Sequence, residues 1–158
     1  MTAIDEASSF SDDDPGPARG EGGTAVDEYQ ARIDALRILL RDLRAKKAEL
    51  LAARAELIVA LIDNVTGAET TTGALKDLIR GVEQDLDELI PRRQYWKNAA
   101  GRVEQALDVT GEPADSKAGR SRAEEGRQLI TEVRRANAKL DLESKQLRFI
   151  ASLAERRI

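Results

Sequence analysis

The chain of 158 residues has no cysteine and no histidine, and only 3% of its residues are aromatic. Without these side chains it cannot form a disulfide, a thiol nucleophile or a Ser-His triad, and it lacks the ligands of nearly every zinc, haem or iron–sulfur site. It has no run of 18 apolar residues and no signal-peptide pattern at its N-terminus. We therefore expect a cytoplasmic protein with no metal and no cofactor.

The hydrophobic residues that are present indicate helices. Leu, Ile, Val and Ala supply almost all of the apolar side chains, whereas sheets rely on aromatic and β-branched residues. Glycine-rich phosphate loops and nucleophile elbows are missing too. The composition predicts an all-α protein that is not an enzyme.

Acidic residues are concentrated at the N-terminus. Residues 1–26 hold six acidic residues and one basic residue, while the remainder of the chain is close to neutral. This segment is rich in Gly, Pro, Ser and Asp, and it cannot bury enough surface to offset the entropy of ordering it. We expect a tail over residues 1–26 that is disordered in isolation, followed by a folded domain over residues 27–158.

Three segments of the folded domain carry a heptad pattern. Apolar residues recur at alternating steps of three and four across residues 29–61, 75–107 and 129–154. The pattern predicts three helices of similar length, over about 27–65, 73–109 and 117–157. Short connections between equal helices favour an up-down-up three-helix bundle. The alternative is an extended coiled coil in which the connections open.

Turn-forming residues mark the helix ends. Gly67 suits the left-handed position after the first helix, and Thr70-Thr-Thr-Gly73 supplies an N-cap for the second. Pro91 lies inside the second segment, yet the apolar register continues across it, so we expect one long helix kinked near residues 87–91. The third helix is expected to begin at Asp115 or Ser116, or to restart at Ser121.

We call the row of residues at the a and d positions of each heptad pattern a seam. Four charged residues interrupt the otherwise apolar seams: Lys47, Arg54, Arg93 and Glu143. A polar residue in a seam lowers stability but fixes register and the number of partners. We expect these four residues to set the register, with Arg54 near Glu83 and Lys47 near Glu143. The alternative is that their long side chains reach the solvent at the rim.

Apolar residues also flank two of the seams. Leu51, Ile58 and Val65 are expected to widen the buried stripe of the first helix, and Leu142, Phe149 and Leu153 add a second apolar stripe to the third helix.

Two segments are candidate partner-binding sites. The stretch 91–97 combines bases with aromatic rings at Arg92, Arg93, Tyr95 and Trp96. Such a mixture can contact a protein or stack on nucleobases, but a domain near neutral charge does not favour nucleic acid. Trp96 also lies in the apolar heptad pattern, so the alternative is that its ring belongs to the core.

The tail carries the second candidate. Phe10 precedes the acidic run Asp12, Asp13 and Asp14, a pattern typical of a docking segment in which the ring fills a pocket and the charge steers approach. A tail that only increases solubility is the alternative.

Carboxylate pairs such as Glu83 and Asp87 lack the histidine of helical two-metal sites, so we expect no metal.

Part of the first helix resembles a known family. Arg32-Ile-Asp-Ala-Leu36 followed by Leu50-Leu-Ala-Ala-Arg54 is similar to the first helix of the all-helical chorismate mutases. The resemblance implies an enzyme in which Arg32 and Arg54 contact the substrate. The interval between the two motifs is about one heptad longer here, and the position of the family's downstream lysine falls near Val65.

In outline the chain is also similar to the small helical chaperones of flagellar and type III secretion. Three hypotheses follow, and the first is a non-enzymatic structural or adaptor subunit of a larger assembly, for example a phage particle or a secretion machine. It would join protein subunits, its own copies or other chains, without nucleic acid or membrane. An export or assembly chaperone is the second hypothesis, and a mutase-like enzyme is the third.

Overall fold

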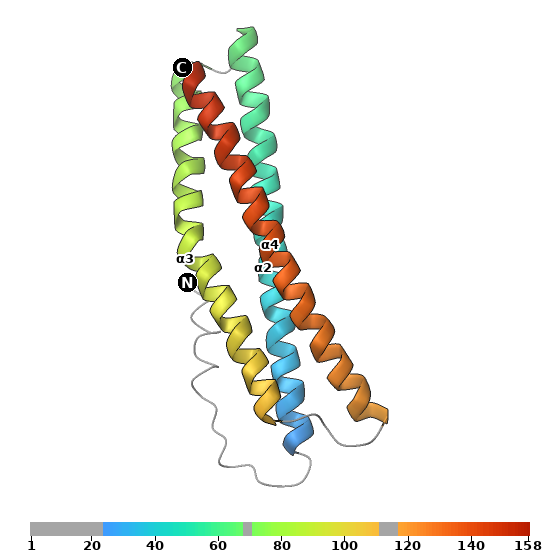
Figure 1. The fold of residues 1–158 in the computed structure, drawn as a ribbon. Helices are drawn as coiled ribbons and strands as arrows, with labels where there is room; N and C mark the ends of the chain where they lie inside the picture. The colour runs from blue at the N-terminus through green and yellow to red at the C-terminus, as the bar shows by residue number, and fades with distance from the viewer. Residues whose placement is uncertain (1–23, 68–70, 111–116) are drawn as a thin grey trace. The chain divides into compact units, whose positions relative to one another are not determined.

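A computed structural model describes residues 24–67, 71–110 and 117–158. Within this part of the chain there are three helices and no strand: α2 (Thr24–Thr66), α3 (Thr72–Thr110) and α4 (Lys117–Arg157) (Figure 1). The helices pack on one another as an all-α three-helix bundle, which confirms the predicted fold class. The predicted docking segment at Phe10, Asp12, Asp13 and Asp14 lies outside the described residues.

The helix ends follow from their sequence. Gly67 has a φ of 73°, and its N–H donates to the carbonyl oxygen of Asn64 at 3.3 Å, which closes α2. The hydroxyl oxygen of Thr71 accepts a hydrogen bond from the N–H of Ala74 at 3.0 Å and caps α3. Pro91 lies inside α3, so the continuity predicted from the unbroken apolar register is confirmed. Ser121 lies inside α4 and does not restart it.

The chain divides into two compact units, and each contains a segment of all three helices. The first unit comprises the described residues within 24–42 and 95–136, and the second comprises those within 43–94 and 137–158.

In the first unit, α2 and α4 run in the same direction. Arg122 donates to the side-chain oxygen of Gln30 at 2.9 Å, and Arg37 forms an ion pair with Glu125, so the residue numbers rise together on the two helices. Apolar side chains of all three segments fill the centre, with exposures of 5% or less: Tyr29, Ile33, Leu36, Leu39, Leu40, Trp96, Ala99, Val103, Leu107, Ala123 and Val133.

In the second unit, α3 runs opposite to α4. Arg93 pairs with Asp141 at 3.0 Å and Arg148 with Asp87 at 3.1 Å, so the numbers fall on one helix as they rise on the other. The buried side chains of this unit come from all three helices: Leu43, Leu50, Leu57, Leu75, Ile79, Val82, Leu86, Leu89, Leu140, Leu147, Ala151 and Ala154.

The flanking apolar residues of α2 differ from the expectation that they widen the buried stripe, and the second apolar stripe of α4 lies on the surface. Leu51 is half-buried, whereas the other five are exposed: Ile58, Val65, Leu142, Phe149 and Leu153. In α4 the buried position is Ala151, with Ile150 only half-buried at the rim. A small residue at position 151 lets α4 pack closely there, so the larger side chains beside it point outward.

Candidate interaction surface

The charged seam residues pair across the helices of the second unit. The guanidinium of Arg54 lies 3.1 Å from a carboxylate oxygen of Glu143 and donates to the amide oxygen of Gln146 at 2.7 Å. Arg54 thus pairs with Glu143 and not with the expected Glu83. Arg93 pairs with Asp141. These contacts give α4 a defined position against both α2 and α3.

Glu83 instead meets a residue of like charge. Burial raises the pKa of its carboxyl, and the nearby carboxylate of Glu155 on α4 raises it further; Asp87 acts in the same direction, while Arg148 lowers the pKa. This arrangement makes the charged form of Glu83 less favourable in the folded chain than in the unfolded chain. Neither Glu83 nor Glu155 belongs to a possible metal site, since the described residues contain no group of three potential ligands.

The segment that combines bases and aromatic rings is only partly available to a partner. Trp96 is 1% exposed and belongs to the core of the first unit. The Tyr95 ring is half-buried, with the guanidinium of Arg102 6.0 Å from its centroid. Arg92 and Arg93 belong to the second unit, where both are half-buried. The largest ring of the segment therefore serves packing.

The exposed side of α2 changes character along the helix. In the first unit it carries Asp34, Arg37 and Arg41, which form ion pairs with neighbouring residues. In the second unit one strip of outward positions carries no charge: Ala48, Ala52, Ala55, Ile58, Val59, Ile62 and Val65, with the half-buried Leu51 beside it, while Arg44, Glu49 and Glu56 are exposed outside this strip.

Residues of α4 extend this uncharged strip. Because Arg54 contacts Gln146, and α2 and α4 run in the same direction, the residues one to three turns further along lie at similar heights on the two helices. These are Ile58 and Val65 on α2 and Leu153 on α4, with Phe149 on the outer side. We call the following set the outer apolar face: Ala55, Ile58, Val59, Ile62, Val65, Phe149 and Leu153. Val59, Ile62 and Phe149 are 58%, 54% and 62% exposed.

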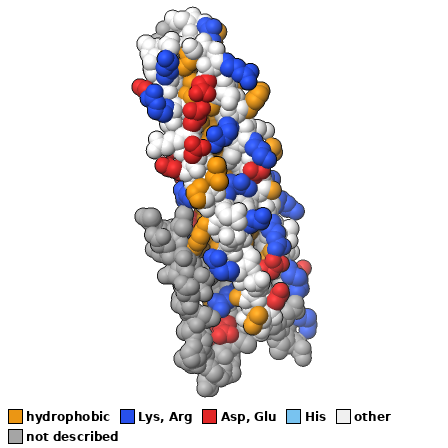
Figure 2. Space-filling model, turned by 60° about the vertical axis from the view of Figure 1, so that its left-hand side comes forward, with side chains coloured by type: hydrophobic (Ala, Val, Ile, Leu, Met, Phe, Trp, Pro, Cys, Tyr) orange, Lys and Arg blue, Asp and Glu red, His pale blue; other side chains and the backbone are white. Residues whose placement is uncertain are grey.

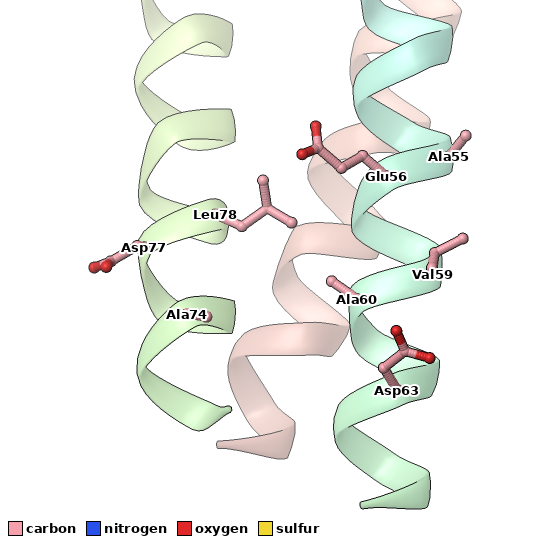
Figure 3. A pocket seen from close by; sticks show the side chains of 8 residues that line it. All are labelled: Ala55, Glu56, Val59, Ala60, Asp63, Ala74, Asp77 and Leu78. Carbon is pink, nitrogen blue, oxygen red and sulfur yellow. The ribbon is translucent and has the colours of Figure 1, made fainter. Parts of the chain in front are cut away.

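A groove borders the outer apolar face on its α3 side. It has a volume of about 790 Å³ and is lined by Ala55, Glu56, Val59, Ala60 and Asp63 of α2 and by Ala74, Asp77 and Leu78 of α3. Figure 3 shows Leu78 and Ala60 pointing into the space between the helices, with Val59 on the outer side of α2. Its floor is apolar, and all of its charged lining residues are carboxylates.

No family model, curated protein or solved structure matches the chain. None of the described helices combines the length and hydropathy needed to cross a bilayer. On the face seen in Figure 2, basic and acidic side chains are mixed, with small hydrophobic patches between them.

Several residues that the structure makes prominent were not identified from the sequence. Val59 and Ile62 belong to Leu57-Ile-Val-Ala-Leu-Ile62, six apolar residues in succession, which is long enough to cover every side of a helix. That run was the available signal. Asn137 was missed as well: it is half-buried within the heptad of α4, and its side-chain oxygen is buried without a hydrogen bond. The pattern of apolar residues around it gave no sign of it.

Proposed function

We propose that the chain is a non-enzymatic structural or adaptor subunit that joins proteins through its helical faces. The observation that supports this most directly is the uncharged outer side of α2 between residues 48 and 65. A contiguous apolar surface of several hundred Å² on a monomer marks an interaction site. No other described part of α2 has a comparable stretch of uncharged outward positions.

The chemistry of the partner follows from the surface. An apolar face with a carboxylate rim fits protein side chains, and the near-neutral charge of the helical domain does not favour nucleic acid. The acidic tail with Phe10 adds a second contact in this proposal. The setting is the cytoplasm or a particle assembled there, such as a phage particle or part of a secretion machine.

Arg54 argues for the adaptor and against the mutase-like alternative. In that alternative its guanidinium contacts a substrate, but in the structure Glu143 and Gln146 both bind it. Binding a substrate anion would require breaking a charge-assisted pair that is already formed.

Affinity capture from the organism that makes the chain tests the proposal. We expect the unmodified chain to retain a defined set of proteins and the Ile62→Lys variant to lose them. Ile38→Lys is the matched control, because Ile38 is exposed on the same helix but lies in the first unit. Equal recovery with all three chains would contradict the proposed role of the outer apolar face.

The groove between α2 and α3 favours the chaperone as a second candidate function. An open groove with an apolar floor can hold an amphipathic helix of a client. A structural subunit keeps a constant stoichiometry with its partner, whereas a chaperone releases its client. The exchange rate of the captured protein against added free protein separates the two functions.

A further inference from the structure

The geometry points to a second copy of this chain as the occupant of the outer apolar face. We infer a two-fold symmetric dimer whose axis runs along the helices of the second unit, in which Phe149 of each copy enters the groove between α2 and α3 of the other. The inference rests on the proposed function, because it names the partner of the same surface.

The first support is the charge on the two borders of the face. On the α3 side, the border of α2 carries Glu49, Glu56 and Asp63 at intervals of seven residues, and the last two line the groove. The α4 side carries Lys145 and, at the end of α4, Arg156 and Arg157. Glu49 pairs with Lys46 and Lys145 pairs with Asp141 within the chain, so the first border is acidic mainly through Glu56 and Asp63, and the second is basic mainly through Arg156 and Arg157.

The symmetry then follows from the charges. A two-fold axis across the helices would bring the acidic border of one copy against the acidic border of the other, which is unfavourable. An axis along the helices brings the acidic border of each copy against the basic border of its partner. Only the second arrangement covers the apolar face and pairs the opposite charges together.

The residue levels agree with this arrangement. Within one chain, Arg54 contacts residues 89 and 92 positions further along, so α2 and α4 residues about 90 apart lie at the same height. An axis along the helices preserves height. It therefore brings Phe149 of one copy level with Val59 of the other, and Lys145 level with Glu56.

The ends of the groove match in the same way. Arg156 of one copy falls within a turn of Asp63 of the other. Asp63 lines the groove together with Asp77, which Figure 3 shows on the far side of α3. The groove thus receives an aromatic ring at its apolar part and guanidinium groups near Asp63.

The exposed area is suited to self-association. Six large side chains of the face, exposed by about half, leave roughly 500 Å² of apolar surface on each copy. A standard interface buries about 800 Å² per partner, with a polar rim around an apolar centre. The two charged borders provide that rim.

Charge exchange between copies tests the dimer. Sedimentation equilibrium should show a dimer of the full chain, weakened about tenfold or more in the Glu56→Lys and Lys145→Glu variants, because each creates two like-charge contacts per dimer. Mixing the two variants should restore association to nearly the original strength, since both contacts then join opposite charges. Asp108→Lys, an equal charge change on an exposed residue of the first unit, should leave the dimer unchanged.

Within one chain Glu56 and Lys145 lie on opposite borders of the face, so recovery on mixing can arise only between copies. A monomeric unmodified chain at about 100 µM, or two variants that associate as strongly alone as together, would overturn the inference. If the chain is monomeric while capture still depends on Ile62, the proposed function stands and the second copy is wrong. If the mixed variants associate and capture does not depend on Ile62, the dimer stands and the proposed function is wrong.

Discussion

At the residue scale, Arg54 shows how a charged residue in a seam can connect two helices. Its guanidinium joins a carboxylate and an amide oxygen on α4, and both Arg54 and Glu143 are largely shielded from water. Shielding strengthens the attraction and also makes a lone charge costly. The seam position alone could not predict the partner, because the heptad does not set the relative height of two helices.

A double-mutant cycle measures this pair. We expect Arg54→Met and Glu143→Gln to show a coupling free energy of about 1 kcal/mol in thermal or urea unfolding, because each single change leaves the other group without its partner. The exposed pair of Arg80 and Asp77, 3.2 Å apart on α3, is the control and should couple by about 0.3 kcal/mol. Equal coupling for the two pairs would remove the structural role of Arg54.

Glu83 makes stability depend on pH. Its pKa is raised in the folded chain, by burial first and then by Glu155, so the folded state binds this proton more tightly than the unfolded state does. Its contribution to stability is therefore present below the ordinary pKa of 4.5 and is lost as the pH rises through the raised value. Glu83→Gln should have a higher Tm than the unmodified chain at pH 7.

The Tm difference should shrink as the pH falls towards 4. Asp85→Asn, at an exposed acid on the same helix, serves as the control for a change of one charge. A Tm difference for Glu83→Gln that stays constant between pH 4 and pH 7 would contradict the effect assigned to Glu155 and burial.

At the element scale, heptad spacing was sufficient to locate the three helices and most of the core. Every apolar seam residue expected in α3 is buried, from Leu75 to Leu107. The unbroken apolar register also correctly predicted that α3 continues across Pro91. The same spacing could not predict whether the side chains of Ile58 and Phe149 are buried or exposed. A flanking apolar residue can either widen a core or lie on the surface, and the packing of the neighbouring helix decides between them.

The glycines of α3 and α4 separate backbone preference from packing. A Cβ at Gly81 would meet nothing within 4 Å, so Gly81→Ala should stabilise the chain by about 1 kcal/mol and raise its Tm by a few degrees. A Cβ at Gly126 would lie 3.2 Å from the Tyr29 hydroxyl oxygen and 3.6 Å from a methyl group of Leu107.

Gly126→Ala should therefore gain less than Gly81→Ala or lower the Tm, because Tyr29 is buried and must shift to make room. Differential scanning calorimetry of the two variants checks both expectations together. A larger gain at Gly126 than at Gly81 would show that the packing around Tyr29 is looser than the structure indicates.

At the scale of the whole molecule, the contrast along α2 links structure to function. Its first half is covered by ion pairs with residues of the first unit, and the outer side of its second half is apolar and bordered by carboxylates. Exposed apolar surface promotes association. Under the proposed function, the first half of α2 faces the solvent and the outer side of the second half contacts a partner.

The absence of cysteine permits a direct test of that claim. Val59→Cys and Ile38→Cys each introduce a single thiol, the first on the outer apolar face and the second on the exposed side of α2 in the first unit. The rate of modification by a soluble thiol reagent is then measured at protein concentrations from 1 to about 100 µM, a range that brackets weak self-association. We predict that the rate for Val59→Cys falls several-fold as the concentration rises, while that for Ile38→Cys stays constant. Equal and constant rates for the two thiols across this range would contradict the account.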